Sequence, residues 1–489
     1  MKSKRSISRR TAFKTFGAVG ALLALSPCQS RGRAAVGQPP PKTARPADFR
    51  KVISERVFNA PLIDTHEHLI DESRRLGGAP SSGIPCDDWA LLMSHYLNSD
   101  LLVAGMPKPD LDLFLSSKCD PGAKWKLIAP YWSAVRNTGY AQDVRIACRE
   151  LYDVADLSAA TVSKVQAGYE KVRRAGFYKR ILQDLSGIES CQVNSLSGEP
   201  FKESEMPSLL MQDISIVGMF AGSGLRAYVR KYAPATGIEV KTLGNWHGAI
   251  DWWFERYARY AVAVKSQQAY SRDIDYLRVP AEKAEPVFQK VLQDDPVTAE
   301  ERKLLEDHLF WYCVDNATTH QLPVKLHTGY YAGQNSMPLA RLLHNPGSAT
   351  ELCKLSPETR FVFMHLGYPH YEAMLALAKH YANAHIDMCW SWIINPVAAK
   401  DYFKKHIVTA PANKLLPIGG DYIPVDPVLG HATIVRRGIA LALGELVDEG
   451  WLTLPDALDL VDLILHGNAR RIFRLPQKLG ALRTAPWIK

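Results

Sequence analysis

The segment PLIDTHEHLI, residues 61–70, places two histidines, His66 and His68, two positions apart at the end of an apolar run. Side chains at i and i+2 of a strand point to the same side, so both imidazoles would face one region. Two neutral imidazoles that converge make half of a metal site. The sequence has 15 histidines in 489 residues. An H-x-H triplet then arises by chance about 0.5 times, so the motif alone is weak evidence.

Three later segments end in groups that could complete such a site. LPVKLHTG, RFVFMHLG and LLPIGGDY place His327, His365 and Asp421 near the end of an apolar run and close to glycine. Active sites of (β/α)8 barrels lie at the carboxyl ends of the strands. Four histidines and one aspartate at four strand ends therefore predict a metal site far better than any single histidine does.

Eight short apolar runs could form the strands that position these residues. Nearly continuous apolar character is typical of strands that are buried on both faces of a parallel sheet. Eight strands that alternate with helical segments predict an α/β fold of the (β/α)8 TIM-barrel type. The runs span residues 61–66, 188–196, 211–219, 260–266, 322–329, 360–367, 383–390 and 415–422.

The gap between the first two runs is too long for a plain connection. Residues 70–187 contain several amphipathic helical patterns. We expect a helical insertion after strand one that covers one end of the barrel. It could act as a lid or as the contact surface of a homo-oligomer. We place the barrel, with this insertion, at residues 57–475 and a C-terminal tail at residues 476–489.

The basic charge of the chain is concentrated at its N-terminus. The formal net charge is +9, and residues 1–35 hold eight Lys and Arg side chains and no acid, so subtracting these eight leaves +1. This distribution argues against nucleic acid as a partner. The pair Arg9–Arg10 precedes a short apolar run, residues 16–25, which is the pattern of an export signal.

The arginine pair also resembles a twin-arginine signal, which addresses a bacterial protein to the Tat export machinery. We therefore expect residues 1–35 to be a Tat-type signal peptide and the protein to be exported to the periplasm. Residues 36–56 contain QPPPKTARP, and we expect them to form a stiff, Pro-rich linker.

The order H-x-H, His, His and Asp at the ends of strands one, five, six and eight resembles the amidohydrolase superfamily. LIDTHEH, LPVKLHTGY and PIGGDY are most similar to the amidohydrolase-related branch that also contains aminocarboxymuconate-semialdehyde decarboxylase. The long insertion is similar to that of uronate isomerase. The resemblance implies one divalent metal ion, zinc first and manganese or iron as alternatives, held by His66, His68, His327 and Asp421.

The resemblance also implies the chemistry. Asp421 would take the proton of a metal-activated water, and His365 would act as acid, base or oxyanion stabiliser. We expect a metal-dependent hydrolase that attacks an amide, lactone or related carbonyl bond of a small polar substrate through a metal-bound hydroxide. The same residues would serve a non-oxidative decarboxylase, and a uronate isomerase-like sugar-acid isomerase is a third alternative. A non-enzymatic binding module is the least favoured, because no ligand is missing.

Four further side chains are candidates for binding substrate. Lys265 lies near the end of strand four, where many two-metal members of the family carry a carbamylated lysine. Lys325 precedes His327 by two positions, so it could form an ion pair inside the barrel or face an anionic group of the substrate. Tyr330 and Arg272 could line the pocket, or they could pack on their neighbours.

Overall fold

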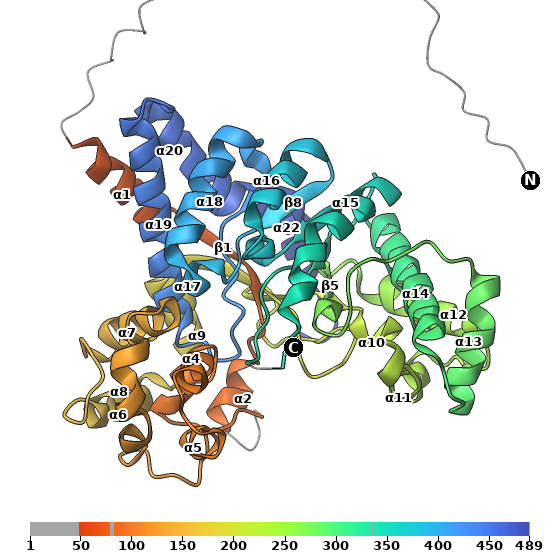
Figure 1. The fold of residues 1–489 in the computed structure, drawn as a ribbon, viewed down its shortest axis with the longest axis horizontal. Helices are drawn as coiled ribbons and strands as arrows, with labels where there is room; N and C mark the ends of the chain where they lie inside the picture. The colour runs from red at the N-terminus through yellow and green to blue at the C-terminus, as the bar shows by residue number, and fades with distance from the viewer. Residues whose placement is uncertain (1–47, 79–82, 335, 489) are drawn as a thin grey trace, which may run out of the picture. The chain divides into compact units, whose positions relative to one another are not determined.

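Parallel strands form the centre of the protein (Figure 1). The computed structural model describes residues 48–78, 83–334 and 336–488, and this part contains nine strands. Each predicted run overlaps a strand, and the third run overlaps two because Asp213 interrupts it. The strands are β1 (Leu62–Glu67), β2 (Ile188–Val193), β3 (Leu210–Gln212), β4 (Ile214–Ser215), β5 (Val264–Ser266), β6 (Val324–Leu326), β7 (Phe361–Phe363), β8 (Ala384–Asp387) and β9 (Leu415–Leu416).

The ladders form two parallel sheets, of order β1-β2-β3 and β4-β5-β6-β7-β8-β9, rather than the single closed sheet of the predicted barrel. In the second sheet, β5 pairs with β6 so that Lys265 lies opposite Lys325. Individual backbone bonds link β1 to the segment after β9. Thr65 N donates to Ile418 O, and Asp421 N donates to His66 O, each at 2.9 Å. The carboxyl end of the first strand is thereby held beside the segment that follows the last strand.

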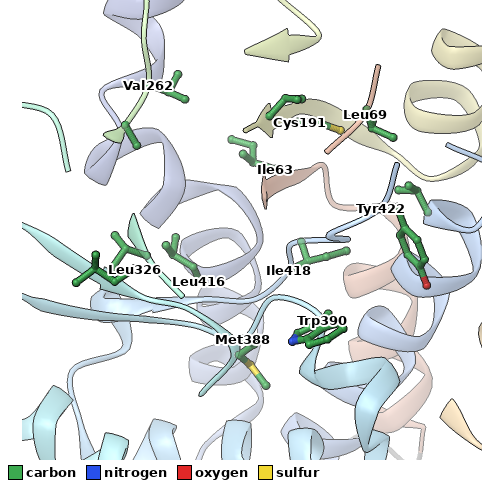
Figure 2. Close-up of a cluster of buried hydrophobic side chains, with 14 of the residues drawn as sticks. Ile63, Leu69, Cys191, Val262, Leu326, Met388, Trp390, Leu416, Ile418 and Tyr422 are labelled. Atoms are coloured by element: carbon green, nitrogen blue, oxygen red, sulfur yellow. The ribbon is translucent and has the colours of Figure 1, made fainter. Parts of the chain in front are cut away.

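The strands are buried on both faces, as their apolar composition predicts. All six residues of β1 are buried, and so are all residues of β5 to β9. Figure 2 shows Ile63 of β1, Leu326 of β6 and Leu416 of β9 in one apolar cluster with Trp390 and Tyr422. The polar residues at the strand ends pack against this apolar cluster.

Helices fill residues 70–187, where the insertion is expected, and gather on one side of the strands (orange in Figure 1). Most are short and carry their buried residues at helical spacing; α7, for example, buries Tyr140, Val144 and Cys148. They are α2 (Glu72–Leu76), η1 (Trp89–Met93), α4 (Leu97–Val103), α5 (Lys108–Phe114), α6 (Lys124–Val135), α7 (Gly139–Tyr152), α8 (Val162–Val172), α9 (Phe177–Lys179) and η2 (Arg180–Leu185).

The remaining helices connect and cover the strands. Those between β4 and β6, drawn in green, lie on the side opposite the insertion in Figure 1. They are α10 (Val217–Phe220), η3 (Gly222–Gly224), α11 (Leu225–Tyr232), η4 (Ala233–Thr236), α12 (Leu243–Tyr257), η5 (Gln268–Tyr270), α13 (Ala281–Gln293) and α14 (Ala299–Thr319). The later ones are η6 (Leu339–His344), α15 (Asn345–Leu355), η7 (His365–Gly367), α16 (Tyr371–His380), α17 (Ser391–Ile394), α18 (Pro396–Thr409), η8 (Ala412–Lys414), α19 (Val428–Asp448), α20 (Leu454–Asp462), η9 (Leu463–Gly467), α21 (Asn468–Ile472) and α22 (Leu475–Leu482).

Both ends of the expected barrel domain differ from their predicted boundaries. Helix α1 (Phe49–Asn59) begins inside the expected linker, because Ile53 and Val57 form an apolar face that is buried. Helix α22 occupies the expected C-terminal tail, with Leu482 buried. The expected signal peptide, residues 1–35, lies outside the described residues. In the described part of the chain, no helix combines the length and the apolar character that a membrane crossing requires.

Candidate metal centre

Three side chains from the two ends of the strand sequence converge on one point. His66 of β1 and His68 directly after it present their Nε2 atoms to Asp421, which follows β9 by five residues. The two Nε2 atoms lie 2.9 Å and 3.1 Å from Asp421 Oδ1. The ligand atoms of the three residues all lie within 4.8 Å of one another. Two imidazoles and a carboxylate at these distances could hold one divalent cation.

The approach of the Asp421 loop to β1 depends on a glycine and two buried carboxyl groups. A Cβ atom at Gly420 would lie 1.9 Å from Glu67 Oε1, so only glycine fits there. Gly420 N donates to Asp64 Oδ2 at 3.2 Å, and Tyr422 N donates to Glu67 Oε2 at 2.7 Å. Burial raises the pKa of both carboxyl groups, that of Asp64 to about 7. Glu67, between the two histidines, thus holds the Asp421 loop against β1.

The protonation states of this group fit a cation. Nδ1 of His68 lies 2.6 Å from the Asn194 carbonyl oxygen and therefore donates, which leaves the Nε2 lone pair facing Asp421. Burial, assisted by the Lys265 ammonium, holds the pKa of His66 well below its usual value. Burial would raise the pKa of Asp421, but His66 and His68 hold it well below its usual range. Imidazole nitrogens beside an ionised carboxylate form the donor set that zinc prefers.

His327, the fourth ligand that the family resemblance implies, lies beside this group. Its Nε2 lies 3.0 Å from the Tyr330 carbonyl oxygen and so carries the proton, which leaves Nδ1 with the lone pair. Burial, with the Lys265 ammonium, lowers the pKa of His327 to about 3. In the part of the chain that the structure describes, the His66–His68–Asp421 group does not include His327. The structure therefore brings three of the four predicted ligands into direct proximity.

His365 is buried, and neither of its ring nitrogens has a hydrogen-bond partner among the described residues. Its Nε2 lies 4.0 Å from Asp421 Oδ2, and its ring centre lies 5.4 Å from that of Trp390. A buried histidine with both ring nitrogens unbonded can bind a metal ion or exchange a proton. His365, Cys389 and Asp421 form a second group of close metal donors. All three have positive φ (61°, 43° and 63°), and such backbone strain is typical of functional sites.

The two candidate lysines have different surroundings. Lys265 Nζ lies 3.5 Å from His66 Nε2, and burial lowers its pKa to about 8. Lys325 Nζ lies 2.8 Å from Asp213 Oδ2 and donates to the Thr65 carbonyl oxygen at 2.8 Å. Lys265 therefore belongs to the neighbourhood of the metal centre. The contacts of Lys325 favour the internal ion pair over the substrate-facing alternative.

Arg272 and Tyr330 also differ. Arg272 bonds Glu306 and Asp307 of α14 at 3.0 Å and 2.6 Å. Because both acids bind the Arg272 guanidinium, these contacts favour a role in packing on neighbouring residues over one in lining the pocket. Tyr330 is half-buried in the loop after β6, with its ring centre 6.4 Å from that of Trp390. It remains a candidate wall of the pocket.

The insertion contributes residues that the sequence analysis did not identify. The Tyr96 hydroxyl donates to the backbone oxygen of Asp421, and its ring centre lies 4.1 Å from that of Trp390. His95 is also close, since burial and the neighbouring His68 lower its pKa to about 4. No spacing or motif connects these positions with residue 421. Their only signal in the sequence is the aromatic, apolar segment WALLMSHYL that contains them.

Part of the chain matches a known protein family. Residues 292–475 match the sequence model of the Amidohydrolase family. Protein fluG of Emericella nidulans is 26% identical over 158 residues, which make up 32% of this chain and 18% of that protein. The chain thus spans less than a fifth of this curated relative.

Solved structures share the fold over nearly the whole chain. Glucuronate isomerase from Caulobacter crescentus is 16% identical, with a TM-score of 0.71 over 91% of this chain and 97% of its own. Uronate isomerase from Thermotoga maritima is 14% identical, with a TM-score of 0.69 over 87% and 97%. A protein from Lactobacillus casei described as a metal-dependent hydrolase is 14% identical, with a TM-score of 0.59 over 87% and 98%. These likenesses show that the chain shares the fold of these proteins.

Proposed function

We propose that the protein is a metal-dependent hydrolase that cleaves an amide, lactone or related carbonyl bond of a small polar substrate. The observation that carries this proposal is the convergence of His66, His68 and Asp421 within 4.8 Å at the strand ends. The family match to amidohydrolases supports it. Zinc is the proposed metal, because imidazole and carboxylate donors at a site of this kind suit it, although manganese and iron bind similar sets.

A divalent metal held by these residues would polarise a carbonyl group and lower the pKa of a bound water to about 7. Asp421 is ionised and accepts a proton at its carboxylate. His365 has both ring nitrogens free to hold or deliver a proton, and it lies 4.0 Å from Asp421 Oδ2. The rings of Tyr96 and Trp390 lie beside Asp421 and His365 and form an apolar wall there. His327 and Lys265 are further polar residues beside the proposed metal site.

A second candidate is a sugar-acid isomerase on the same centre. The likeness to uronate and glucuronate isomerases favours it, since it extends over 97% of those chains. Isomerisation would use the same acid–base pair, Asp421 and His365, to move a proton between neighbouring carbons. A non-oxidative decarboxylase, the first alternative from the sequence, becomes the third candidate, because the residues present would serve it as well.

The products formed from a panel of substrates distinguish the three candidate reactions. The zinc-loaded protein would be screened with lactones, amides, aromatic carboxylates and uronates, with hydrolysis products, CO₂ and sugar isomers measured in parallel. We expect a hydrolysis product without CO₂. Release of CO₂ without hydrolysis, or interconversion of uronates alone, would contradict the proposed reaction and select one of the alternatives.

We also propose export to the periplasm through the twin-arginine pair. Replacing Arg9 and Arg10 by lysine keeps the charge and removes the arginine-specific signal. Fractionation of bacterial cells should find the wild-type chain in the periplasm and the Arg9→Lys/Arg10→Lys variant in the cytoplasm. The same distribution for both chains would refute twin-arginine export.

A further inference from the structure

A pocket of about 910 Å³ lies between α7 of the insertion and helices α17, α18 and α19. Its volume is within the range of roughly 300–1,000 Å³ that is typical of small-molecule sites. None of the residues that line it belongs to the donor groups of the metal centre. The pocket is therefore a separate feature of the protein.

Helices α7 and α19 each turn a face of apolar, polar and charged residues toward the same space. On α7 these residues recur at intervals of three and four, the spacing of one helix face, and the same is true of α19. From α7 they are Gln142, Arg145, Ile146 and Arg149, and from α19 Ile434, Arg437, Gly438, Leu441 and Glu445. Such a pattern on both walls indicates one amphipathic cavity rather than an accidental gap.

The indole of Trp392 is buried beneath the pocket, between α17 and α19. Its Nε1 donates to the Pro417 carbonyl oxygen at 2.7 Å, so the polar atom of the ring is satisfied inside the protein. A Cβ atom at Gly438 would lie 2.2 Å from Cζ3 of this ring, so glycine is what lets the indole lie against α19. Beside it, Val397 is 74% exposed and Leu441 is 43% exposed. Apolar surface of this kind is suited to an apolar ligand body.

The charged lining residues are four cations and one carboxylate. Lys400 forms an ion pair with Glu445 at 2.5 Å, and Arg145 forms one with Asp156 at 3.1 Å. Arg437 is exposed, and within the described residues it forms no ion pair. A guanidinium without a partner at the rim of an apolar pocket is a ready site for a carboxylate, sulfonate or phosphate.

We propose that this pocket binds a small organic anion with an apolar body, which lies on Val397 and Leu441 with its anionic group at Arg437. The site is independent of the proposed hydrolytic reaction and of its substrate. The pocket is concave, and Arg437 adds a positive charge at its rim while the other lining cations have acidic partners, which suits a small amphiphilic anion better than a flat protein surface.

Titration calorimetry with decanoate on the zinc-loaded protein tests the proposal, with decanol as the neutral analogue. We expect saturable binding of decanoate, and binding of decanol that is weaker by about fivefold, the effect of one partly exposed charge pair. Arg437→Gln should weaken decanoate by about the same factor, and Leu441→Gln should weaken both ligands. Lys118→Gln, which removes an exposed charge elsewhere, should leave binding unchanged.

The metal-site variant His66→Ala separates this proposal from the proposed function, because decanoate binding should persist in it. Loss of binding in His66→Ala would place decanoate at the metal centre and overturn the proposal. So would equal affinity of the wild type and Arg437→Gln, or the absence of saturable binding. Sedimentation of the wild type and Val397→Glu distinguishes a self-association surface. A dimer that Val397→Glu dissociates, together with no decanoate binding, would replace the ligand by a second copy of the chain.

Discussion

Lys325 and Asp213 form an ion pair in which neither side chain is exposed to solvent. A buried pair of this kind adds little over an apolar pair of the same size, but removing one partner leaves an uncompensated charge in the interior. Lys325→Met should therefore lower the free energy of unfolding by about 3–5 kcal/mol. Urea denaturation measures this change.

The control for this prediction is Lys283→Met, at an exposed lysine of α13. The double variant Lys325→Met/Asp213→Leu should recover much of the lost stability, because no unpaired charge remains. A Lys325→Met variant as stable as the control would contradict the internal ion pair and reopen a substrate-facing role for this lysine.

His385 of β8 gives the stability a pH dependence of predictable sign. Burial lowers its pKa to about 4, whereas the unfolded chain has a value of about 6.5. Between these values the unfolded state binds the extra proton, so stability rises as pH increases from about 4 to 6.5. His385→Gln should flatten this slope by up to about 3 kcal/mol across the window. Denaturation curves at several pH values test it, with exposed His380→Gln as the control; a steeper slope in His385→Gln would contradict the sign.

The helical insertion, residues 70–187, forms hydrogen bonds with the loop that carries Asp421. Tyr96 donates a hydrogen bond to the backbone oxygen of Asp421, and the Tyr422 hydroxyl donates to Asp143 of α7. Two bonds from the insertion thus fix the loop that carries the carboxylate ligand. Groups that orient a metal ligand in this way are typically worth about 10–100-fold in metal affinity.

Tyr96→Phe removes the hydroxyl and keeps the ring beside Trp390. We expect zinc affinity to fall by about tenfold or more, with little change in the unfolding temperature of the metal-free protein. Competition with a chromophoric chelator measures the affinity. Tyr131→Phe, elsewhere in the insertion, serves as the control. Unchanged zinc affinity in Tyr96→Phe would show that the insertion does not position Asp421.

At the scale of the whole molecule, the strands and the residues at their ends could be predicted, because apolar runs and histidines are local features. The positions of all eight runs overlap strands, although Asp213 divides the third. The contacts that decide roles could not be predicted. Arg272 is occupied by two acids of α14, thirty-four and thirty-five positions later. Tyr96 reaches Asp421 across 325 positions, and no sequence pattern encodes such a distance.

The sequence also could not predict how the strands pair at the ends of each sheet. The predicted eight-stranded barrel appears as two parallel sheets, because several strands are only two or three residues long and their neighbours pair through isolated backbone bonds. The expected export signal, residues 1–35, and most of the expected linker lie outside the described residues. Periodicity indicates which residues are buried, but it does not fix where a ladder begins or ends.

The central claim is that His66, His68 and Asp421 hold one divalent metal ion. Elemental analysis of the purified wild-type chain and of His66→Ala, after removal of loosely bound metal, tests it most directly. The account predicts about one equivalent of a divalent metal, zinc first, in the wild type and its loss in the variant. A wild-type chain without tightly bound metal, or a variant with the same metal content, would contradict it.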